Sequence, residues 1–380
     1  MSNKVFNIVM ILLILVVVFY FSINVFLKNE EEKATNNGDS KEIVVLNDIE
    51  EVSEKLNEAF DSGEDGIATL YISNDISEDD LKKVNMSINS MKGSIISFTT
   101  YESNNDNLNN SYRKVEFEYE KADTMYVYDN LVNHIEIPSD KQEALQLRNV
   151  CQKILNDEIK NYMTDYDKEL VIHDYIINHC KYGNSDNKDN SEYTAYGALI
   201  NGKAVCSGYA AAANLLLMCA GVECKIVTGV ATSTKNGKVE TENHAWNQVK
   251  IGGEWYHLDV TWDDPVADKD TLIHEYFNIK DSIIQADHEW EDVNASECNS
   301  MKNNFYMKNG AYIYDKASLE NYVRININTD RATQIECALS GISVTDDDLA
   351  FIYDYNGVES VSYSQSGKPE YNILSVYINE

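Results

Sequence analysis

The sequence predicts a mixed α+β protein, in which one buried helix packs on an antiparallel sheet and smaller α+β modules lie on both sides. The run Tyr209–Ala220 is almost wholly apolar, which is typical of a helix that is buried all round. Two strand-like runs flank Gly252 and Gly253, a pair that favours a hairpin turn. Short segments of helical and strand periodicity alternate before residue 139 and after residue 298.

The chain begins with a segment that is apolar enough to cross a bilayer. Val5–Leu27 exceeds the about 20 residues that a crossing needs, and Tyr20 carries the one polar group within Ile8–Phe21. A cleaved signal peptide is the alternative, but its apolar part spans roughly 7–15 residues, and no A-x-A-like cleavage site follows here. We therefore expect a transmembrane anchor at residues 1–28, an N-terminus in the cytoplasm, and a polar stalk at residues 29–41 that leads to an extracytoplasmic body.

The charge balance limits the classes of partner. The chain of 380 residues has 31 Lys and Arg against 63 Asp and Glu, a net charge of −32. A surface of this sign repels phosphate backbones and anionic lipid headgroups. We therefore expect no nucleic-acid partner, and a membrane contact only through the N-terminal helix.

Residues 42–138 are predicted to form the first small α+β module. Its expected helices and strands are 48–60 (helix), 67–72 (strand), 77–90 (helix), 95–101 (strand), 112–119 (strand) and 124–128 (strand). A central domain at 139–298 opens with helical stretches at 139–163 and 167–180. A second α+β module follows at 299–380, where SVTDDDL faintly resembles ISEDDL of the first module, a likeness too short to predict a repeat.

The cysteines do not indicate a disulfide scaffold or a zinc site. Their number, seven, is odd, no C-x-x-C pair occurs, and no Cys/His group has zinc-ligand spacing. Most are expected to be small buried hydrophobic residues, and the seven are Cys151, Cys180, Cys206, Cys219, Cys224, Cys298 and Cys337. A disulfide role for Cys206 remains open at this point.

Cys206 is predicted to lie at the N-terminus of the apolar helix. The helix follows a turn at Gly202-Lys203 and is expected to end at Gly221. Unpaired N–H groups and the helix dipole favour an anion at this end, and a cysteine pKa falls there. Gly208 would keep the approach to the sulfur open. The alternative is a cysteine that merely packs at a helix start.

A histidine and an aspartate fall on one face of the predicted hairpin. If Gly252 and Gly253 form a two-residue loop, Ile251 opposes Glu254, and His244 opposes Thr261. Asp259, two residues back from Thr261, then lies diagonally across from His244. A register slip of one residue would separate the two side chains, unless a bulge compensated for it.

Together these residues make a Cys206–His244–Asp259 constellation suited to acyl transfer. A histidine deprotonates or ion-pairs with the thiol, and a carboxylate fixes the imidazole tautomer and supports its charge. Backbone N–H groups at the start of the helix are candidate donors to the oxyanion of an acyl intermediate. No metal or cofactor is needed for this chemistry.

Residues 167–290 resemble the transglutaminase-like superfamily of papain-like cysteine enzymes. The resemblance rests on IHDYIINHCKYG, AYGALINGKAVCSGYA, GVECKIVTG, NHAWNQVKIGGEWYHLDVTWDD, and HEYFNI followed by HEW. It is greatest with bacterial membrane-anchored or secreted members. It implies Cys206 as the nucleophile, His244 as the base and Asp259 as the orienting acid. The first module and the C-terminal tail are outside it.

Other polar residues in this region are interpreted as structural. His173, His274 and His288 are expected to pack, and His257 to be a neighbour of the site without a role. Trp246 and Trp262 are candidates for shielding an acyl-enzyme from water. No role is assigned to three tyrosines that could border the cleft, Tyr193, Tyr196 and Tyr209. Four acids resemble a cation site but lack EF-hand spacing, and are expected to be solvated: Asp263, Asp264, Asp268 and Asp270.

The expected function is therefore cysteine-dependent acyl transfer on peptide or glutamine carbonyls at the cell envelope. An amine that resolves the thioester gives cross-linking, whereas water gives proteolysis or deamidation, and the sequence does not choose between them. Envelope proteins and wall peptides are the candidate substrates. The alternative is a catalytically silent domain of the same fold that binds or scaffolds envelope components.

Overall fold

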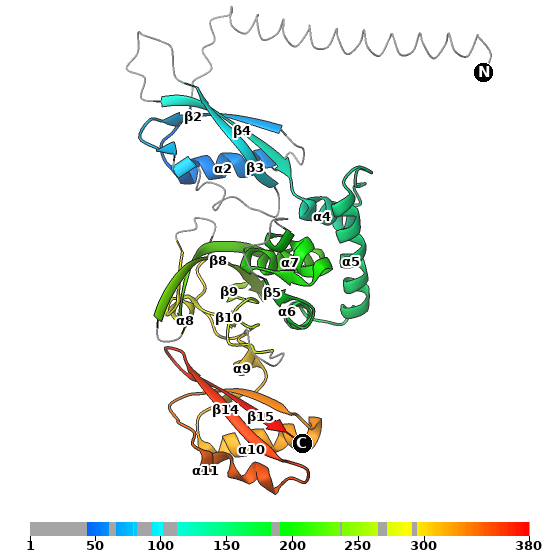
Figure 1. Cartoon of the computed structure of the whole chain (residues 1–380), viewed down its shortest axis with the longest axis vertical. Helices are drawn as coiled ribbons and strands as arrows, with labels where there is room; N and C mark the ends of the chain where they lie inside the picture. Colours follow the sequence, from blue (N-terminus) through cyan, green and yellow to red (C-terminus); the bar gives the residue numbers. More distant parts are fainter. Residues whose placement is uncertain are drawn as a thin grey trace, which may run out of the picture. The chain divides into compact units, whose positions relative to one another are not determined.

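The computed structural model describes residues 44–60, 66–78, 80–81, 93–101, 112–183, 191–235, 238–264, 272–290 and 295–379. The predicted anchor at 1–28 and stalk at 29–41 lie outside these residues. Among the residues described, no helix has the length and apolarity that a bilayer crossing requires. The mixed α+β fold class is confirmed, with helices and several sheets along the chain (Figure 1).

In its described residues, the first module has a four-stranded sheet and the long helix α2, while most of the helix expected at 77–90 lies outside these residues. The strand order is β1-β2-β4-β3. Helix α2 buries Val52, Leu56 and Phe60, which share one face because they are four residues apart. The elements are β1 (Val45–Leu46), α2 (Ile49–Phe60), β2 (Gly66–Ser73), β3 (Gly93–Tyr101) and β4 (Tyr112–Lys121).

The expected strand at 124–128 is wrong, because these residues belong to helix α4 (Asp123–Asn133). The aromatic and β-branched run Tyr126-Val127-Tyr128 favours a strand locally. In the structure Thr124 and Val127 are buried, and Leu131 packs against the central core, so the apolar residues recur at helical spacing. Packing against the central domain has overridden the local preference.

The central domain packs helix α7 (Cys206–Cys219) on a five-stranded sheet of order β10-β9-β8-β7-β11. The predicted register is confirmed, since Ile251 pairs with Glu254 and Asn247 with Leu258. Asn247 Nδ2 donates to Ala210 O at 3.0 Å and so ties strand to helix. The strands are β7 (Cys224–Lys235), β8 (Lys238–Ile251), β9 (Glu254–Leu258), β10 (Phe277–Ile279) and β11 (His288–Glu289).

Short elements complete the central domain around helices α5 (Gln142–Glu158) and α6 (Asp165–His179). The two-residue strands β5 (Lys181–Tyr182) and β6 (Lys203–Ala204) pair in parallel just before α7. The remaining elements are the 3-10 turn η1 (Ser191–Tyr193), the π-helical turn η2 (Gly197–Asn201), α8 (Asp281–Ile284) and α9 (Phe305–Lys308). Helices α5, α6 and α7 share one apolar core with the sheet.

The C-terminal module has the topology of the first module. Its strand order is β12-β13-β15-β14, and a long helix again follows the first strand. The short sequence likeness between the two modules also has a structural counterpart. Thr345 and Asp348 bond to each other reciprocally at the N-terminus of α11, and Ser77 and Asp80 bond to each other in the first module. The elements are β12 (Tyr312–Ile313), α10 (Lys316–Asp330), β13 (Gln334–Leu339), α11 (Asp346–Leu349), η3 (Ala350–Asp354), β14 (Ser360–Gly367) and β15 (Asn372–Asn379).

Candidate active site

Helix α7 begins at Cys206, which is partly exposed. Gly208 matters for a different reason than the one expected, since a Cβ atom there would lie 2.5 Å from Glu192 O. The glycine therefore lets the η1 segment approach the first turn of the helix. Gly221 adopts φ +82° just after the helix, as a terminating glycine does. All seven cysteines of the chain are free thiols, so a disulfide role for Cys206 is not supported.

His244 and Asp259 meet, although not through the predicted strand pairing. His244 Nε2 lies 2.6 Å from Asp259 Oδ2. Strand β9 ends at Leu258, one residue before the acid, so the expected pairing of His244 with Thr261 does not form. The chain turns instead, and Asp259 Oδ1 accepts from the backbone N–H groups of Thr261 at 3.0 Å and Trp262 at 3.1 Å.

Asp259 is completely buried and bonded through both of its oxygens. In addition to the two backbone donors and His244, it faces His288 Nε2 at 3.1 Å from Oδ2. Burial alone would raise the pKa of Asp259, but the charge of His244 and the bonds from both histidines hold that pKa well below its usual range. The carboxylate is therefore a fixed negative charge with one orientation.

The imidazole of His244 is held between this carboxylate and the cysteine. Burial alone would lower the pKa of His244, but Asp259 and Cys206 outweigh burial and raise the pKa to about 10. Because Nε2 is engaged by Asp259, Nδ1 is the ring nitrogen that is left for the sulfur. The structure thus brings all three predicted residues into one cluster, with Asp259 behind His244 and Cys206 beside it.

Aromatic rings surround His244. Trp246 stacks on it with centroids 5.9 Å apart at 18°, and Trp262 lies 5.8 Å away. The Trp246 indole N–H donates to His257 Nδ1 at 2.9 Å, and His257 Nε2 lies 2.8 Å from Asp281 Oδ1. Burial lowers the pKa of His257, in agreement with a neutral ring that accepts at Nδ1 and donates at Nε2. His257 therefore orients the tryptophan without touching the reacting groups.

Sequence reasoning missed the direct contact between His288 and Asp259. His288 comes from the edge strand β11, which pairs with β7. On β7, Gly229 lies opposite His244, and a Cβ atom there would lie 2.1 Å from Glu289 O of β11 and 3.1 Å from the Trp246 ring. A glycine opposite the predicted base was a local signal that another segment packs closely against this position.

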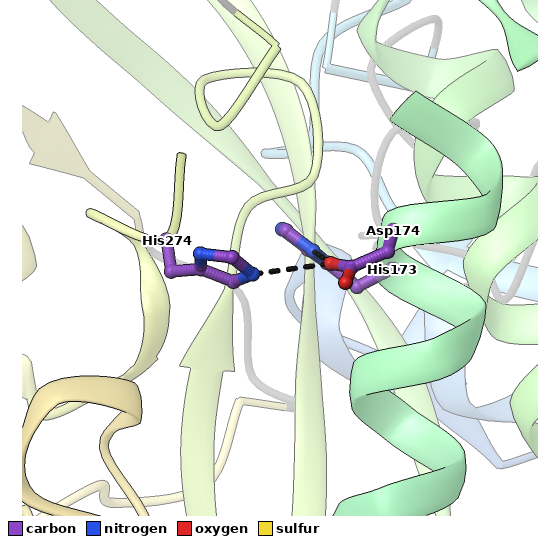
Figure 2. Close-up of side chains that lie close together, drawn as sticks. All are labelled: His173, Asp174 and His274. Carbon is purple, nitrogen blue, oxygen red and sulfur yellow. Dashed lines mark hydrogen bonds and ion pairs between the residues drawn. The ribbon is translucent and has the colours of Figure 1, made fainter. Parts of the chain in front are cut away.

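A second cluster, buried except for the partly exposed Asp174, links helix α6 to the segment around His274 (Figure 2). Asp174 Oδ1 lies 2.9 Å from His173 Nδ1 and 3.1 Å from His274 Nε2. The far nitrogens face two more carboxylates, with His173 Nε2 3.1 Å from Asp263 and His274 Nδ1 3.1 Å from Glu336. Although these residue types bind metals, the carboxylate oxygen itself lies where both imidazoles point. We interpret the cluster as a hydrogen-bond network.

This network corrects one expectation about the acidic run. Asp263 is fully buried, and its Oδ1 accepts from the backbone N–H of Tyr276 at 2.8 Å, so it is not a solvated loop acid. Asp264 accepts a hydrogen bond from the Tyr209 hydroxyl at 2.5 Å, and Tyr209 is a core residue with no exposed surface. Asp268 and Asp270 lie outside the described residues.

The two other tyrosines differ from Tyr209 and from each other. Tyr193 is exposed, whereas the Tyr196 hydroxyl donates to Gln146 on helix α5 at 2.5 Å. Tyr196 therefore ties two helical segments together. The contact between Tyr196 and Gln146 involves none of the three predicted site residues.

Comparisons with known proteins agree with this geometry. Residues 153–260, which include all three predicted site residues, match the family model of the transglutaminase-like superfamily. Kyphoscoliosis peptidase of Homo sapiens is 25% identical over 178 residues, covering 42% of this chain and 27% of that protein. The Mus musculus protein is 26% identical over 125 residues, covering 31% of this chain and 19% of its own length.

The chain thus spans about a quarter or less of the length of these curated relatives. Among solved structures, the chain is similar to that of a TGase. The two chains are 15% identical with a TM-score of 0.29, and the similarity covers 54% of this chain and 53% of the TGase chain. The match to the family model assigns residues 153–260, which lie within the central domain, to the transglutaminase-like superfamily.

Proposed function

We propose that the protein is a cysteine acyl-transfer enzyme that acts on peptide or glutamine carbonyls of proteins. The observation that carries this proposal is the 2.6 Å bond between His244 and Asp259, with Cys206 beside the same imidazole at the start of α7. A buried carboxylate that is itself fully bonded stabilises the imidazolium form, and an imidazolium stabilises a neighbouring thiolate.

The proposed reaction runs through a thioester. The sulfur of Cys206 attacks the carbonyl carbon, a C–S bond forms, and the carbonyl π electrons move to oxygen. The imidazolium of His244 gives its proton to the leaving nitrogen, the electrons on oxygen re-form the carbonyl as the C–N bond breaks, and ammonia or an amine departs. Water or a second amine then attacks the thioester carbon, and its proton passes to His244. The carbonyl re-forms as the C–S bond breaks, which releases the acyl product and restores the thiolate of Cys206 and the imidazolium of His244.

The surroundings of His244 support a site that is protected from bulk water. Trp246 is 1% exposed, and Trp262 lies on another side of the imidazole. Low water access favours resolution of a thioester by an amine, because hydrolysis competes with it. The proposal includes both transamidation and hydrolysis of the thioester.

We further propose that the protein acts at the cell envelope. The support is the apolar segment Val5–Leu27, whose length suits a single membrane crossing. Envelope proteins and wall peptides are then the substrates within reach of the catalytic domain. Fractionation of cells with an alkaline carbonate wash tests this part, since an integral protein stays with the membrane and a peripheral one is released.

Activity is tested by incubating the protein with a glutamine-containing peptide and a primary-amine donor. The assay follows ammonia release, amine incorporation and backbone cleavage by mass spectrometry. We expect at least one of these products, and none with Cys206→Ala. A protein that binds the peptide but forms no product, with Cys206 no more reactive than its other thiols, would instead be the silent scaffold.

A further inference from the structure

A continuous line of ionisable side chains leads from the candidate active site into the C-terminal module. Asp259 Oδ2 faces both His244 and His288, at 2.6 Å and 3.1 Å. The other ring nitrogen of His288, Nδ1, lies 2.6 Å from Asp287 Oδ1. Asp287 Oδ2 in turn lies 3.4 Å from the ammonium nitrogen of Lys368.

Lys368 is a buried lysine from the turn between β14 and β15. Its side chain is 2% exposed, and its ammonium lies 3.0 Å from Glu275 Oε1 and 3.4 Å from the centroid of the Tyr276 ring. Its backbone N–H donates to Tyr371 O at 2.8 Å, so the turn holds it in place. A lysine is almost never fully buried without partners. Here both acidic partners belong to the central domain.

Basic and acidic side chains alternate along this line. Both nitrogens of His288 face carboxylates, so its ring bridges Asp259 and Asp287. Burial alone would raise the pKa of Asp287, but His288, Lys368 and the Tyr276 hydroxyl together lower it. The order from the C-terminal module inward is therefore lysine, carboxylate, imidazole, carboxylate, and finally the imidazole of His244.

Few other charged groups face this line among the described residues. The rings of Trp262, Trp246 and Tyr276 lie 4.5, 5.1 and 5.5 Å from His288. The remaining titratable neighbours are His257, which bonds to Asp281, and Glu275, which accepts from Ser366 Oγ at 2.8 Å. Lys368 is thus the cation at the outer end of the line.

We propose that Lys368 is a positioning residue for the active site. By holding Asp287 in its ionised form, it keeps His288 bonded to Asp259, and through Asp259 it favours the charged pair of His244 and Cys206. The C-terminal module is then part of the catalytic unit. This inference rests on the proposed cysteine chemistry.

The test compares three lysine variants of the full chain. Lys368→Met removes the charge, Lys368→Arg keeps it, and Lys280→Met is the matched control. Lys280 also ties the central domain to the C-terminal turn, 2.7 Å from Glu370, but it does not touch the line. The measurement is the rate at which iodoacetamide labels Cys206 as a function of pH, read by peptide mapping.

We expect Lys368→Met to move the acid limb of this profile to higher pH, because a buried positive charge that favours the thiolate is gone. A shift of this limb by about half to one pH unit corresponds to labelling about three- to tenfold slower near pH 6. Lys368→Arg and Lys280→Met should keep the wild-type profile. If Lys368→Met does not fold, Lys368→Gln replaces it.

A double-mutant cycle tests whether Lys368 acts through His288. In a His288→Gln background, Lys368→Met should have a clearly smaller effect on the profile, namely the part that the charge of Lys368 exerts directly through space. Unchanged labelling in folded Lys368→Met, or a shift as large in Lys280→Met, would overturn the inference. Equal effects of Lys368→Met in both backgrounds would overturn the route through His288.

The result also separates this inference from the proposed function. If wild-type Cys206 labels no faster than Cys219, the other partly exposed cysteine, the proposed cysteine chemistry fails, and this inference fails with it. If wild-type Cys206 labels fast and its rate depends on His244, but Lys368→Met leaves it unchanged, the inference alone fails.

Discussion

Replacing Asp259 by asparagine probes the electrostatic origin of the site most fully. The substitution keeps the size and one accepting oxygen, but removes the negative charge that lies 2.6 Å from His244 Nε2. Two unit charges about 4 Å apart interact by about 4 kcal/mol at an effective dielectric of about 20. Since about 1.4 kcal/mol equals one pKa unit, the pKa of His244 should fall by about three units, from about 10 to about 7.

Removing the charge of Asp259 also affects Cys206, because the thiolate of Cys206 exists together with the imidazolium of His244. The equilibrium between the charged pair and the neutral pair should move toward the neutral pair by up to about a thousandfold. The assay is iodoacetamide labelling of Cys206 near pH 6, with the fold checked by circular dichroism. We expect labelling of Asp259→Asn to slow by at least about tenfold.

Asp263→Asn is the matched control for this experiment. Asp263 is equally buried and also bonds a histidine, His173, but it does not contact His244. Cys206 of the Asp263→Asn protein should therefore be labelled at the wild-type rate. Wild-type labelling in a folded Asp259→Asn protein would refute the reasoning, because the imidazolium would then not depend on the carboxylate.

Three further predictions concern stability. Gly208→Ala should destabilise the fold by about 1–3 kcal/mol in urea unfolding, because the new Cβ atom would lie 2.5 Å from Glu192 O. Gly367→Ala is the control and should change stability little, because the atom nearest to its new Cβ lies 3.5 Å away. Burial alone would lower the pKa of His173, but its two carboxylate neighbours outweigh burial and raise that pKa to about 9. The charged imidazole therefore contributes fully to stability below about pH 6.5, and this contribution is lost as the pH rises through about 9. Wild-type unfolding midpoints should therefore fall over this range, and His173→Gln should flatten the dependence. Leu216→Ala, in the fully buried centre of α7, should cost about 2–5 kcal/mol.

The parts of the fold that the sequence predicted have local causes. A two-glycine turn sets the β8–β9 register, so the pairing of Ile251 with Glu254 could be read directly. The contact of His244 with Asp259 was expected from that register, yet it forms by another route. Strand β9 stops at Leu258, and a turn closed on Asp259 Oδ1 brings the acid back to the histidine.

The parts that were missed depend on contacts between distant segments. His288 and Lys368 reach the site from β11 and from the last hairpin, and no local pattern encodes their convergence. Asp263 was expected to be solvated, because a run of acids usually is, but His173 lies 90 positions away and pairs with it. The segment 124–128 became a helix for the same reason, since its partners lie in the central domain.

The most direct measurement of the central claim is the labelling of Cys206 relative to Cys219 in the native protein near pH 6. Both thiols are partly exposed, but burial raises the pKa of Cys219 to about 12, so the decisive comparison is Cys206 with and without His244. The account predicts that Cys206 labels faster than Cys219 in the wild-type protein, and that His244→Ala slows the labelling of Cys206 by at least about tenfold. Equal rates of the two thiols in the wild-type protein, or unchanged labelling of Cys206 in His244→Ala, would contradict it.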